Sequence, residues 1–213
     1  MTGLVRKTSL MLAACGLLVA GVASANVPDP TQSVIPSVIY LVGNSGGVVD
    51  AANGQFSVTV KDLSGALINN SNVVVDFSAC TDSKLGNAQA DATLSLDCTA
   101  KTVRKFTVAG VVTMTIQGIG NISNTTNGAA LGCARVYADG VLLGRAQVAL
   151  YDHLGGGVAA GDLAAWLSDF FSLVNPSSSD YLTPFNNVSA ADLSKWQSVF
   201  FSLGSTSNAV ACP

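Results

Sequence analysis

The sequence contains no glutamate, one histidine and few charges of either sign. Only 11% of its 213 residues are charged, against roughly a quarter in an average soluble domain. All 13 acidic residues are Asp, and the single histidine is His153, which excludes a metal site built from several histidines. Ten basic residues and a formal net charge of −3 exclude the basic surface typical of nucleic-acid-binding proteins, so we expect no nucleic-acid partner.

An apolar run long enough to span a membrane as a helix is also absent. The longest run, Leu10–Val22, falls short of the roughly 20 residues that a span requires. It follows two basic residues and precedes Ala23-Ser24-Ala25, a pattern typical of a cleaved signal peptide. We predict cleavage after Ala25, which removes residues 1–25 and leaves a protein that is secreted or held at the cell surface of a bacterium. The alternative is a lipoprotein, because Leu12-Ala13-Ala14-Cys15 fits a lipobox.

Cysteine is scarce, and four of the five cysteines follow the predicted cleavage site. An even number in an exported protein predicts two disulfides, for which three pairings exist among Cys80, Cys98, Cys133 and Cys212. Cys80 and Cys98 bracket a polar, turn-rich stretch, which favours a local bridge between them and leaves Cys133 to pair with Cys212. No C-x-x-C spacing is present, which disfavours zinc and thioredoxin-type chemistry.

Residues 26–150 have the texture of a β domain. From Val34 onward Val, Thr and Ser alternate with period two between Gly, Asn and Asp punctuation, which indicates short strands joined by turns. The Asp139-Gly140 pair predicts a tight hairpin turn. Short strands at this spacing predict an antiparallel β-sandwich of immunoglobulin-like size. The expected strands are Gln55–Lys61, Asn72–Phe77, Lys101–Val108, Val111–Ile116 and the hairpin Val136–Leu143.

Two segments of this domain resemble the bacterial immunoglobulin-like (Ig-like) modules of the invasin and intimin type. Gln55–Ser78 contains a strand, then D-x-x-G-x-x-I from Asp62 to Ile68, then a second strand that ends in Phe77-Ser78. Val108–Ile116 is similar to a later strand of these modules, which begins after a turn of small residues. The resemblance implies an Ig-like sandwich that serves as a spacer or an adhesive unit without catalysis.

The C-terminal part of the chain contains an internal repeat. Residues 158–173 align with residues 188–203 at an offset of 30, with ten identities in 16 positions. Apolar residues recur with helical spacing in both copies, and Ser189 with Asp192 forms an S-x-x-D cap before the second helix. We expect two helices that bury their aromatic faces against each other as an antiparallel pair. The residues on these faces are Leu163, Trp166, Leu167, Phe170 and Phe171, then Leu193, Trp196, Phe200 and Phe201.

Each copy also fits the end of a calcium-loop pattern, D-x-N-x-D-G-x-V-x-x-x-D-L. The matching residues are Val158, Asp162 and Leu163, and then Val188, Asp192 and Leu193. The tandem therefore resembles a dockerin, the duplicated loop-helix module with EF-hand-like loops that attaches exported enzymes to cohesin-bearing scaffolds. For residues 151–213 the resemblance implies a docking module with a cohesin-like or cell-surface protein as its partner.

The ligand half of each loop departs from the calcium pattern. With Asp162 and Asp192 at loop position 12, no other carboxylate is in register, whereas calcium takes six to eight oxygen ligands. Asp152 and Asp180 lie 10 and 12 residues before these positions, not the 11 that a twelve-residue loop needs. We therefore expect no metal and no cofactor, and calcium is disfavoured.

Candidates for catalysis are few. His153 stands beside Gly155-Gly156-Gly157, which predicts a solvent-facing loop histidine. Asp82, Asp91 and Asp97 lie near the cysteines and could pair as acid and base in carbohydrate chemistry, although polar loops usually hold such Asp residues as turn formers. The sequence thus predicts a mainly β protein with a small α module that binds or supports and does not catalyse. The alternative is a small secreted carbohydrate-active or carbohydrate-binding component of a cellulosome-like assembly.

Overall fold

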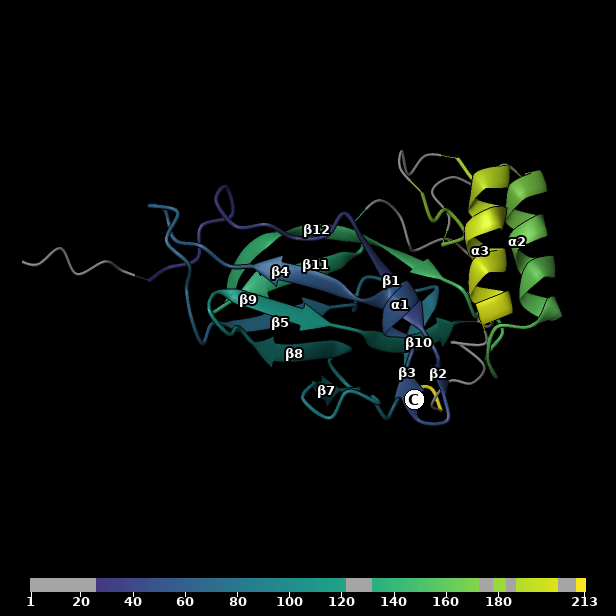
Figure 1. Cartoon of the computed structure of the whole chain (residues 1–213), viewed down its shortest axis with the longest axis horizontal. Helices are drawn as coiled ribbons and strands as arrows, with labels where there is room; N and C mark the ends of the chain where they lie inside the picture. Colours follow the sequence, from purple (N-terminus) through teal and green to yellow (C-terminus); the bar gives the residue numbers. More distant parts are fainter. Residues whose placement is uncertain (1–25, 122–131, 173–177, 183–186, 203–209) are drawn as a thin grey trace, which may run out of the picture.

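The computed structural model describes residues 26–121, 132–172, 178–182, 187–202 and 210–213. An elongated β body forms most of the molecule, and two helices lie at one end of it (Figure 1). The prediction of a mainly β protein with a small helical part is confirmed. The predicted signal peptide and Cys15 lie outside the described residues. Among these residues no helix is long and apolar enough to cross a membrane.

The larger sheet has eight strands, and its third strand, β1, is parallel to both of its neighbours, β10 and β12. All other pairings in this sheet are antiparallel. In spatial order the strands are β6 (Ser83–Leu85), β10 (Ile116–Gly120), β1 (Val38–Val42), β12 (Val141–Leu150), β11 (Ala134–Ala138), β5 (Asn72–Asp76), β8 (Thr102–Phe106) and β7 (Ser95–Asp97).

A second sheet pairs β4 (Phe56–Thr59) with β9 (Val111–Met114) in antiparallel register. The chain passes from β9 through Thr115 directly into β10, so the stretch predicted as one strand from 111 to 116 serves both sheets. A small hairpin of β2 (Asn44–Ser45) and β3 (Val48–Val49) and a short helix α1 (Ala51–Gly54) follow β1.

The alternating sequence explains how the strands build the core. Phe56 and Val58 of β4 are buried while Ser57 between them is exposed, and Val73 and Val75 of β5 are fully buried. The predicted hairpin between β11 and β12 is also confirmed. Asp139 and Gly140 both have positive φ angles, 48° and 85°, as a primed two-residue turn requires.

The four cysteines form two disulfides as predicted, but the predicted pairing is wrong. Cys80 pairs with Cys133 at a Cα–Cα distance of 5.1 Å, and Cys98 pairs with Cys212 at 5.4 Å. Residues 81–87 do not close a local turn, because β6 lies within them and pairs with β10. Cys80 is instead buried in the core, close to Cys133 at the start of β11.

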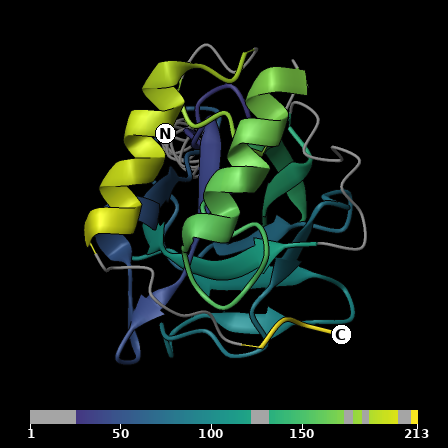
Figure 2. The same cartoon turned by 90° about the vertical axis from the view of Figure 1, so that its right-hand side faces the viewer.

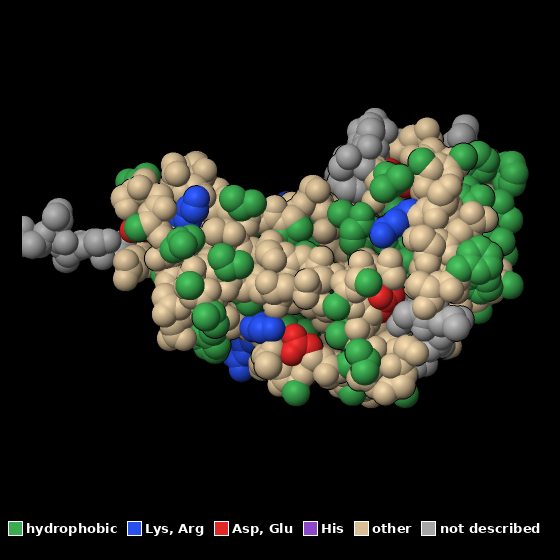
Figure 3. Space-filling view, in the orientation of Figure 1, with side chains coloured by type: hydrophobic (Ala, Val, Ile, Leu, Met, Phe, Trp, Pro, Cys, Tyr) green, Lys and Arg blue, Asp and Glu red, His purple; other side chains and the backbone are tan. Residues whose placement is uncertain are grey.

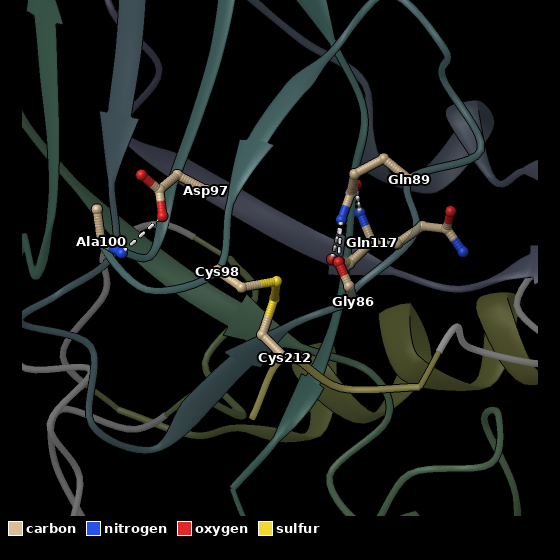
Figure 4. Close-up of a disulfide and its surroundings, with 7 residues drawn as sticks. All are labelled: Gly86, Gln89, Asp97, Cys98, Ala100, Gln117 and Cys212. Carbon is tan, nitrogen blue, oxygen red and sulfur yellow. Dashed lines mark hydrogen bonds between the residues drawn. A yellow bond between two sulfur atoms is a disulfide. The ribbon is translucent and has the colours of Figure 1, made fainter.

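The last residues of the chain return to the β body as a short extra strand. The amide of Cys212 donates to the carbonyl of Leu85, and the amide of Asn87 donates to the carbonyl of Val210, both at 2.7 Å. Figure 4 shows the disulfide between Cys98 and Cys212 that fastens this segment. The C-terminus is therefore tied to the β body by Cys98, where the predicted pairing had Cys133, and residues 210–213 lie on the β body and not with the helices.

Helices α2 (Ala160–Ser172) and α3 (Ala190–Ser202) occupy equivalent positions in the sequence repeat and are equally long. They lie side by side across one end of the β body, where Figure 2 views them face on. Both carry an Asp in the first turn, Asp162 and Asp192, where the positive end of the helix dipole favours an acidic side chain. The repeat therefore predicts the position and length of both helices.

Candidate functional site

The two helices and the end of the β body share one buried apolar cluster. Trp166 and Trp196 lie at its centre, each 2% exposed, and Val42 of β1 and Ala149 of β12 contribute from the β body. The helices therefore pack on the β body as well as sharing a core, where the sequence suggested packing on each other alone. Six of the nine residues predicted on the packing faces lie in this cluster: Leu163, Trp166, Phe170, Leu193, Trp196 and Phe200.

Three stacked tyrosines connect the β body to the helical part. Tyr151 lies between Tyr40 and Tyr181, with ring centroids 5.6 Å and 4.9 Å apart. The Tyr181 hydroxyl donates to the carbonyl of Leu150 at 2.8 Å, and the Tyr40 hydroxyl donates to the carbonyl of Tyr181. Burial raises the pKa of all three tyrosines, so they stay protonated. The Tyr151 hydroxyl is buried without a hydrogen-bond partner. Sequence analysis missed this stack, because its members are distant along the chain.

The internal symmetry is broken at the two tryptophans. The Trp196 indole donates to the carbonyl of Tyr151 at 3.1 Å. The Trp166 indole nitrogen is buried without a hydrogen-bond partner. The β body thus contacts the two halves of the repeat differently.

Asp162 and Asp192 organise the two loops through backbone amides. Asp162 Oδ1 accepts the amides of His153 and Leu154 at 2.7 Å and 2.9 Å, and its Oδ2 accepts that of Ala159 at 2.8 Å. Asp192 repeats this arrangement. Its Oδ1 accepts the amides of Tyr181 and Leu182 at 2.7 Å and 2.9 Å, and its Oδ2 accepts the amide of Ser189 at 2.9 Å. The Ser189 hydroxyl also donates to Asp192 at 2.6 Å, which agrees with the predicted cap.

Asp152 and Asp180 occupy equivalent positions in the two loops. Asp152 directly precedes His153, whose amide donates to Asp162, and Asp180 directly precedes Tyr181, whose amide donates to Asp192. Asp152 accepts the amides of Gly155 and Gly157, and Asp180 accepts that of Asn187 at 3.1 Å. Gly155 and Gly157 have φ angles of 84° and 101°, which a residue with a side chain rarely adopts. Sequence analysis set Asp152 and Asp180 aside because their spacings differ. The hydrogen bonds show that the second loop is two residues longer.

These hydrogen bonds determine what the loops can bind. Calcium requires a shell of oxygen ligands, but here the carboxylates of Asp152, Asp162 and Asp192 accept N–H groups. Amide donors that point into a loop carry partial positive charge and oppose a cation. No group of three or more His, Cys, Asp or Glu side chains placed to hold a metal occurs among the described residues.

His153 was predicted to face solvent, but it is half-buried at the junction of both loops. Its Nε2 lies 3.3 Å from the Ser179 hydroxyl and 3.5 Å from that of Tyr181, and Ser179 donates to Asp169 of α2 at 2.6 Å. Burial lowers the pKa of His153, against the opposing effects of Asp169 and Asp152. Ser179 is fully buried, so a substrate cannot reach it as a nucleophile. The network connects loop to helix.

The outer face of α2 and α3 was not predicted. Phe171 and Phe201 are 75% and 74% exposed, and Leu167 is 37% exposed, although the sequence placed all three with the buried tryptophans. A rotation of 100° per residue puts Phe171 about 140° from Trp166 around the helix. The apolar stripe is therefore wider than the surface that the β body covers.

All four charged side chains of the two helices are directed away from this outer face. Asp162 and Asp192 are 1% exposed, Asp169 accepts from Ser179, and Lys195 lies over the Tyr40 ring at 5.9 Å. Over both helices the exposed residues are Ala, Gly, Ser, Gln, Leu and Phe. We define the outer face as these exposed residues of α2 and α3. Figure 3 shows hydrophobic side chains gathered over these helices.

The aspartates considered for carbohydrate chemistry serve local contacts. Asp91 forms an ion pair with Lys105 at 3.1 Å and accepts the amide of Thr93 at 2.9 Å. Asp97 accepts the amide of Ala100 at 3.0 Å, a turn contact visible in Figure 4. Asp82 is buried, at 6% exposure. The contacts of Asp91 and Asp97 are those of ion-pair and turn residues.

No family model matches the chain. Comparisons with curated proteins and with solved structures also found no match.

Proposed function

We propose that this protein is a non-catalytic, exported binding protein in which an Ig-like sandwich carries a dockerin-like docking module. The observation that carries the proposal is the outer face of α2 and α3, which is uncharged and presents Phe171 and Phe201 to solvent. A surface helix normally has charged residues on its outward side. Aromatic enrichment with depletion of charge is the composition of the core of a protein–protein interface.

The strand order supports the Ig-like part of the proposal. An Ig sandwich places strands G, F and C in one sheet, variable-type domains add C′ and C″, and strands B and E lie in the other sheet. The order β12-β11-β5 fits G, F and C, and the pair β4–β9 fits B and E. Strands β8 and β7 extend the sheet beyond β5 on the side of C′ and C″, but in the reverse order along the chain, and the switch from β9 into β10 is a further departure from that plan.

The duplicated loops support the dockerin-like part. In both copies an Asp in the first helical turn accepts two amides from the start of the loop. It also accepts the amide of the residue three positions before the Asp itself. Asp162 and Asp192 thus hold each loop against its own helix, as a bound ion would in a calcium loop. We propose that the module retains the dockerin-like arrangement with carboxylates in place of metal.

Export is supported by the two disulfides. Disulfides form and persist in oxidising compartments and are rare in the cytosol, and Cys80–Cys133 and Cys98–Cys212 use every cysteine after residue 25. Cleavage after Ala25 is the export route we favour. The partner is then a protein outside the cytoplasm, of the cohesin-like or cell-surface kind.

The test is site-specific photo-crosslinking in the cells that produce the protein. A photoreactive phenylalanine analogue replaces Phe171 or Phe201, and the control variant carries it at Leu63, which is 78% exposed in a turn of the β body. We expect protein adducts from positions 171 and 201 and none from position 63. Adducts of equal yield from all three positions, or none from the helices, would overturn the proposal.

A further inference from the structure

His153, the single histidine of the chain, is held from two sides through its backbone. Its amide donates to Asp162 Oδ1 at 2.7 Å, which fixes it to the start of α2. On the other side, Gly120 of β10 lies so close that a Cβ there would overlap the carbonyl of His153. The Gly120 amide also donates to the carbonyl of Asp152 at 2.8 Å. The imidazole ring therefore extends from a fixed backbone position between the β body and the helices.

Two buried hydroxyls from the start of the second loop face this ring. The Ser179 hydroxyl lies 3.3 Å and the Tyr181 hydroxyl 3.5 Å from His153 Nε2, and Ser179 and Tyr181 are both fully buried. A hydroxyl has only one proton to donate. Ser179 donates its proton to Asp169 of α2. Tyr181 donates its proton to the carbonyl of Leu150. Towards His153 both oxygens can therefore only accept.

These contacts determine which ring nitrogen of His153 carries the proton. Because Nε2 faces two acceptors, it has to be the N–H nitrogen, so the neutral ring is the Nε2–H tautomer. As a donor it connects the first loop, to which it belongs, with Ser179 and Tyr181 of the second loop. Since Ser179 is in turn bonded to Asp169, both loops and α2 meet at this one ring.

The groups around the ring decide what acid does to it. Burial, the largest effect, lowers the pKa of His153, and the charges of Asp169 and Asp152 oppose it. The carbonyl of Leu150 at the end of β12 also favours the protonated ring. Tyr181 stays neutral, because burial raises its own pKa. The titratable groups that contact His153 or act on its ring are Asp152 of the first loop, Asp162 and Asp169 of α2, and Tyr181 of the second loop.

We infer that His153 is a pH-sensitive switch that holds the second loop against the first loop and α2 when it is neutral, and releases it in mild acid. The neutral ring donates to the junction, whereas the protonated ring places a charge in a half-buried position. An opened junction therefore binds the proton more tightly than the closed one. The inference concerns how the helical part is held, and it does not depend on what the outer face binds.

The sign of the effect follows from the direction of the pKa shift. The pKa of His153 is lower in the folded protein than the ordinary value of 6.5. Its stabilising contribution is therefore full above pH 6.5 and is lost as the pH falls through the lower pKa of the folded protein. The junction should accordingly be closed at neutral pH and open more often in mild acid.

The first test is NMR spectroscopy of the untagged protein, in which every imidazole signal belongs to His153. Long-range proton–nitrogen spectra should show the Nε2–H tautomer at pH 8. A titration from pH 8 to pH 5 should give a midpoint below that of the same chain unfolded in urea. An Nδ1–H tautomer would overturn the inference, and so would a midpoint at or above that of the unfolded chain.

The second test compares wild type with His153→Gln, whose amide keeps an N–H donor near the position of Nε2 and does not titrate. The readout is hydrogen exchange, corrected for intrinsic rates, of the Tyr181 and Leu182 amides, which donate to Asp192. From pH 8 to pH 5 their protection should fall in wild type relative to the variant. The expected loss is up to about tenfold for each unit by which the pKa of His153 lies below that of the unfolded chain.

The comparison isolates His153, because the titrations of Asp162 and Asp180 occur in both proteins. Amides of β5 in the β body should keep their protection throughout, which distinguishes a local opening from unfolding of the whole protein. Equal dependence on pH in wild type and His153→Gln would contradict the switch. If the variant does not fold, the wild-type tautomer and titration midpoint decide.

Discussion

At the scale of single residues, aspartate is the acidic residue that holds the loops and helix starts of this protein, because its carboxylate accepts their backbone amides. Its short side chain reaches amides within the same turn, and the three N–H bonds to Asp162 are an extended case of a helix cap. Burial raises the pKa of Asp162, and the amides of Ala159, Leu154 and His153 oppose that rise. The carboxylate is buried because the loop encloses it.

Asp180 is a buried aspartate with only one of its two carboxylate oxygens hydrogen-bonded. It is 1% exposed, its Oδ2 accepts the amide of Asn187, and its Oδ1 has no hydrogen-bond partner. Burial raises its pKa to about 6, with a further contribution from the charge of Asp192. A carboxyl with a raised pKa binds its proton more tightly in the folded state. Its stabilising effect is therefore full below pH 4 and lost as the pH rises through about 6.

We predict that Asp180→Asn raises the melting temperature by a few degrees at pH 7 and has little effect at pH 4. The amide imitates the neutral acid, so it removes the cost of a buried charge only where wild-type Asp180 is ionised. The measurement is the difference in melting temperature between variant and wild type from pH 4 to pH 8. The titrations of His153 and Asp162 occur in both proteins, so their contributions cancel in the difference. A difference that does not change with pH would contradict the assignment.

At the scale of elements, local sequence patterns predicted the strands and helices that form through contacts between residues close in the sequence. Alternation located β4, β5 and β8, and the repeat located both helices. The sequence did not reveal β6, a polar strand of three residues whose partner β10 is distant in the chain. The disulfide pairing failed for the same reason, since it depends on where β6 carries the chain. The exposure of Phe171 was missed because a wide apolar stripe does not specify which edge the β body covers.

The C-terminal strand shows how a non-local contact stabilises an edge. Residues 210–212 pair with the chain around Leu85–Asn87 and cover the open side of β6, and Cys98–Cys212 closes a separation of 114 residues. Replacing both cysteines, Cys98→Ser with Cys212→Ser, should lower the free energy of unfolding by about 2–5 kcal/mol, because the unfolded chain regains the freedom of a long loop.

Urea denaturation under non-reducing conditions measures this loss, and the intact Cys80–Cys133 bridge keeps the core comparable. Single Ser variants at Cys98 and at Cys212 serve as controls, since each should lose as much as the double variant. A loss below about 1 kcal/mol would mean that the terminal strand is held by its backbone pairing alone.

At the scale of the whole molecule, the helical part is anchored at both ends and is not a module on a flexible linker. β12 runs directly into the first loop at Tyr151, and the chain returns to the β body at Val210. Between these anchors the tyrosine stack and the tryptophans share one core with β1 and β12. The outer face is therefore presented at a fixed orientation on the end of the β body, which favours binding with little loss of entropy.

The same rigidity leads to a prediction about calcium. The loops are already held by N–H bonds to Asp152, Asp162 and Asp192, so an ion would have to displace these bonds and face the partial positive charge of the amides. A calcium site at 100 times its dissociation constant would stabilise the protein by about 2.7 kcal/mol and raise the melting temperature by several degrees. We expect no such rise in calcium and no fall on adding a chelator.

Variants distinguish an absent site from a weak one. Asp162→Asn with Asp192→Asn should lower the melting temperature by the same amount in calcium and in chelator, because the loss is of amide hydrogen bonds at two helix starts, about 1 kcal/mol for each cap. Asp139→Asn, in the turn at the other end of β12 from the first loop, controls for the loss of a carboxylate elsewhere. If calcium stabilised the wild type but not the double variant, Asp162 and Asp192 would be calcium ligands. That result would contradict the proposal that carboxylates hold the loops in place of metal.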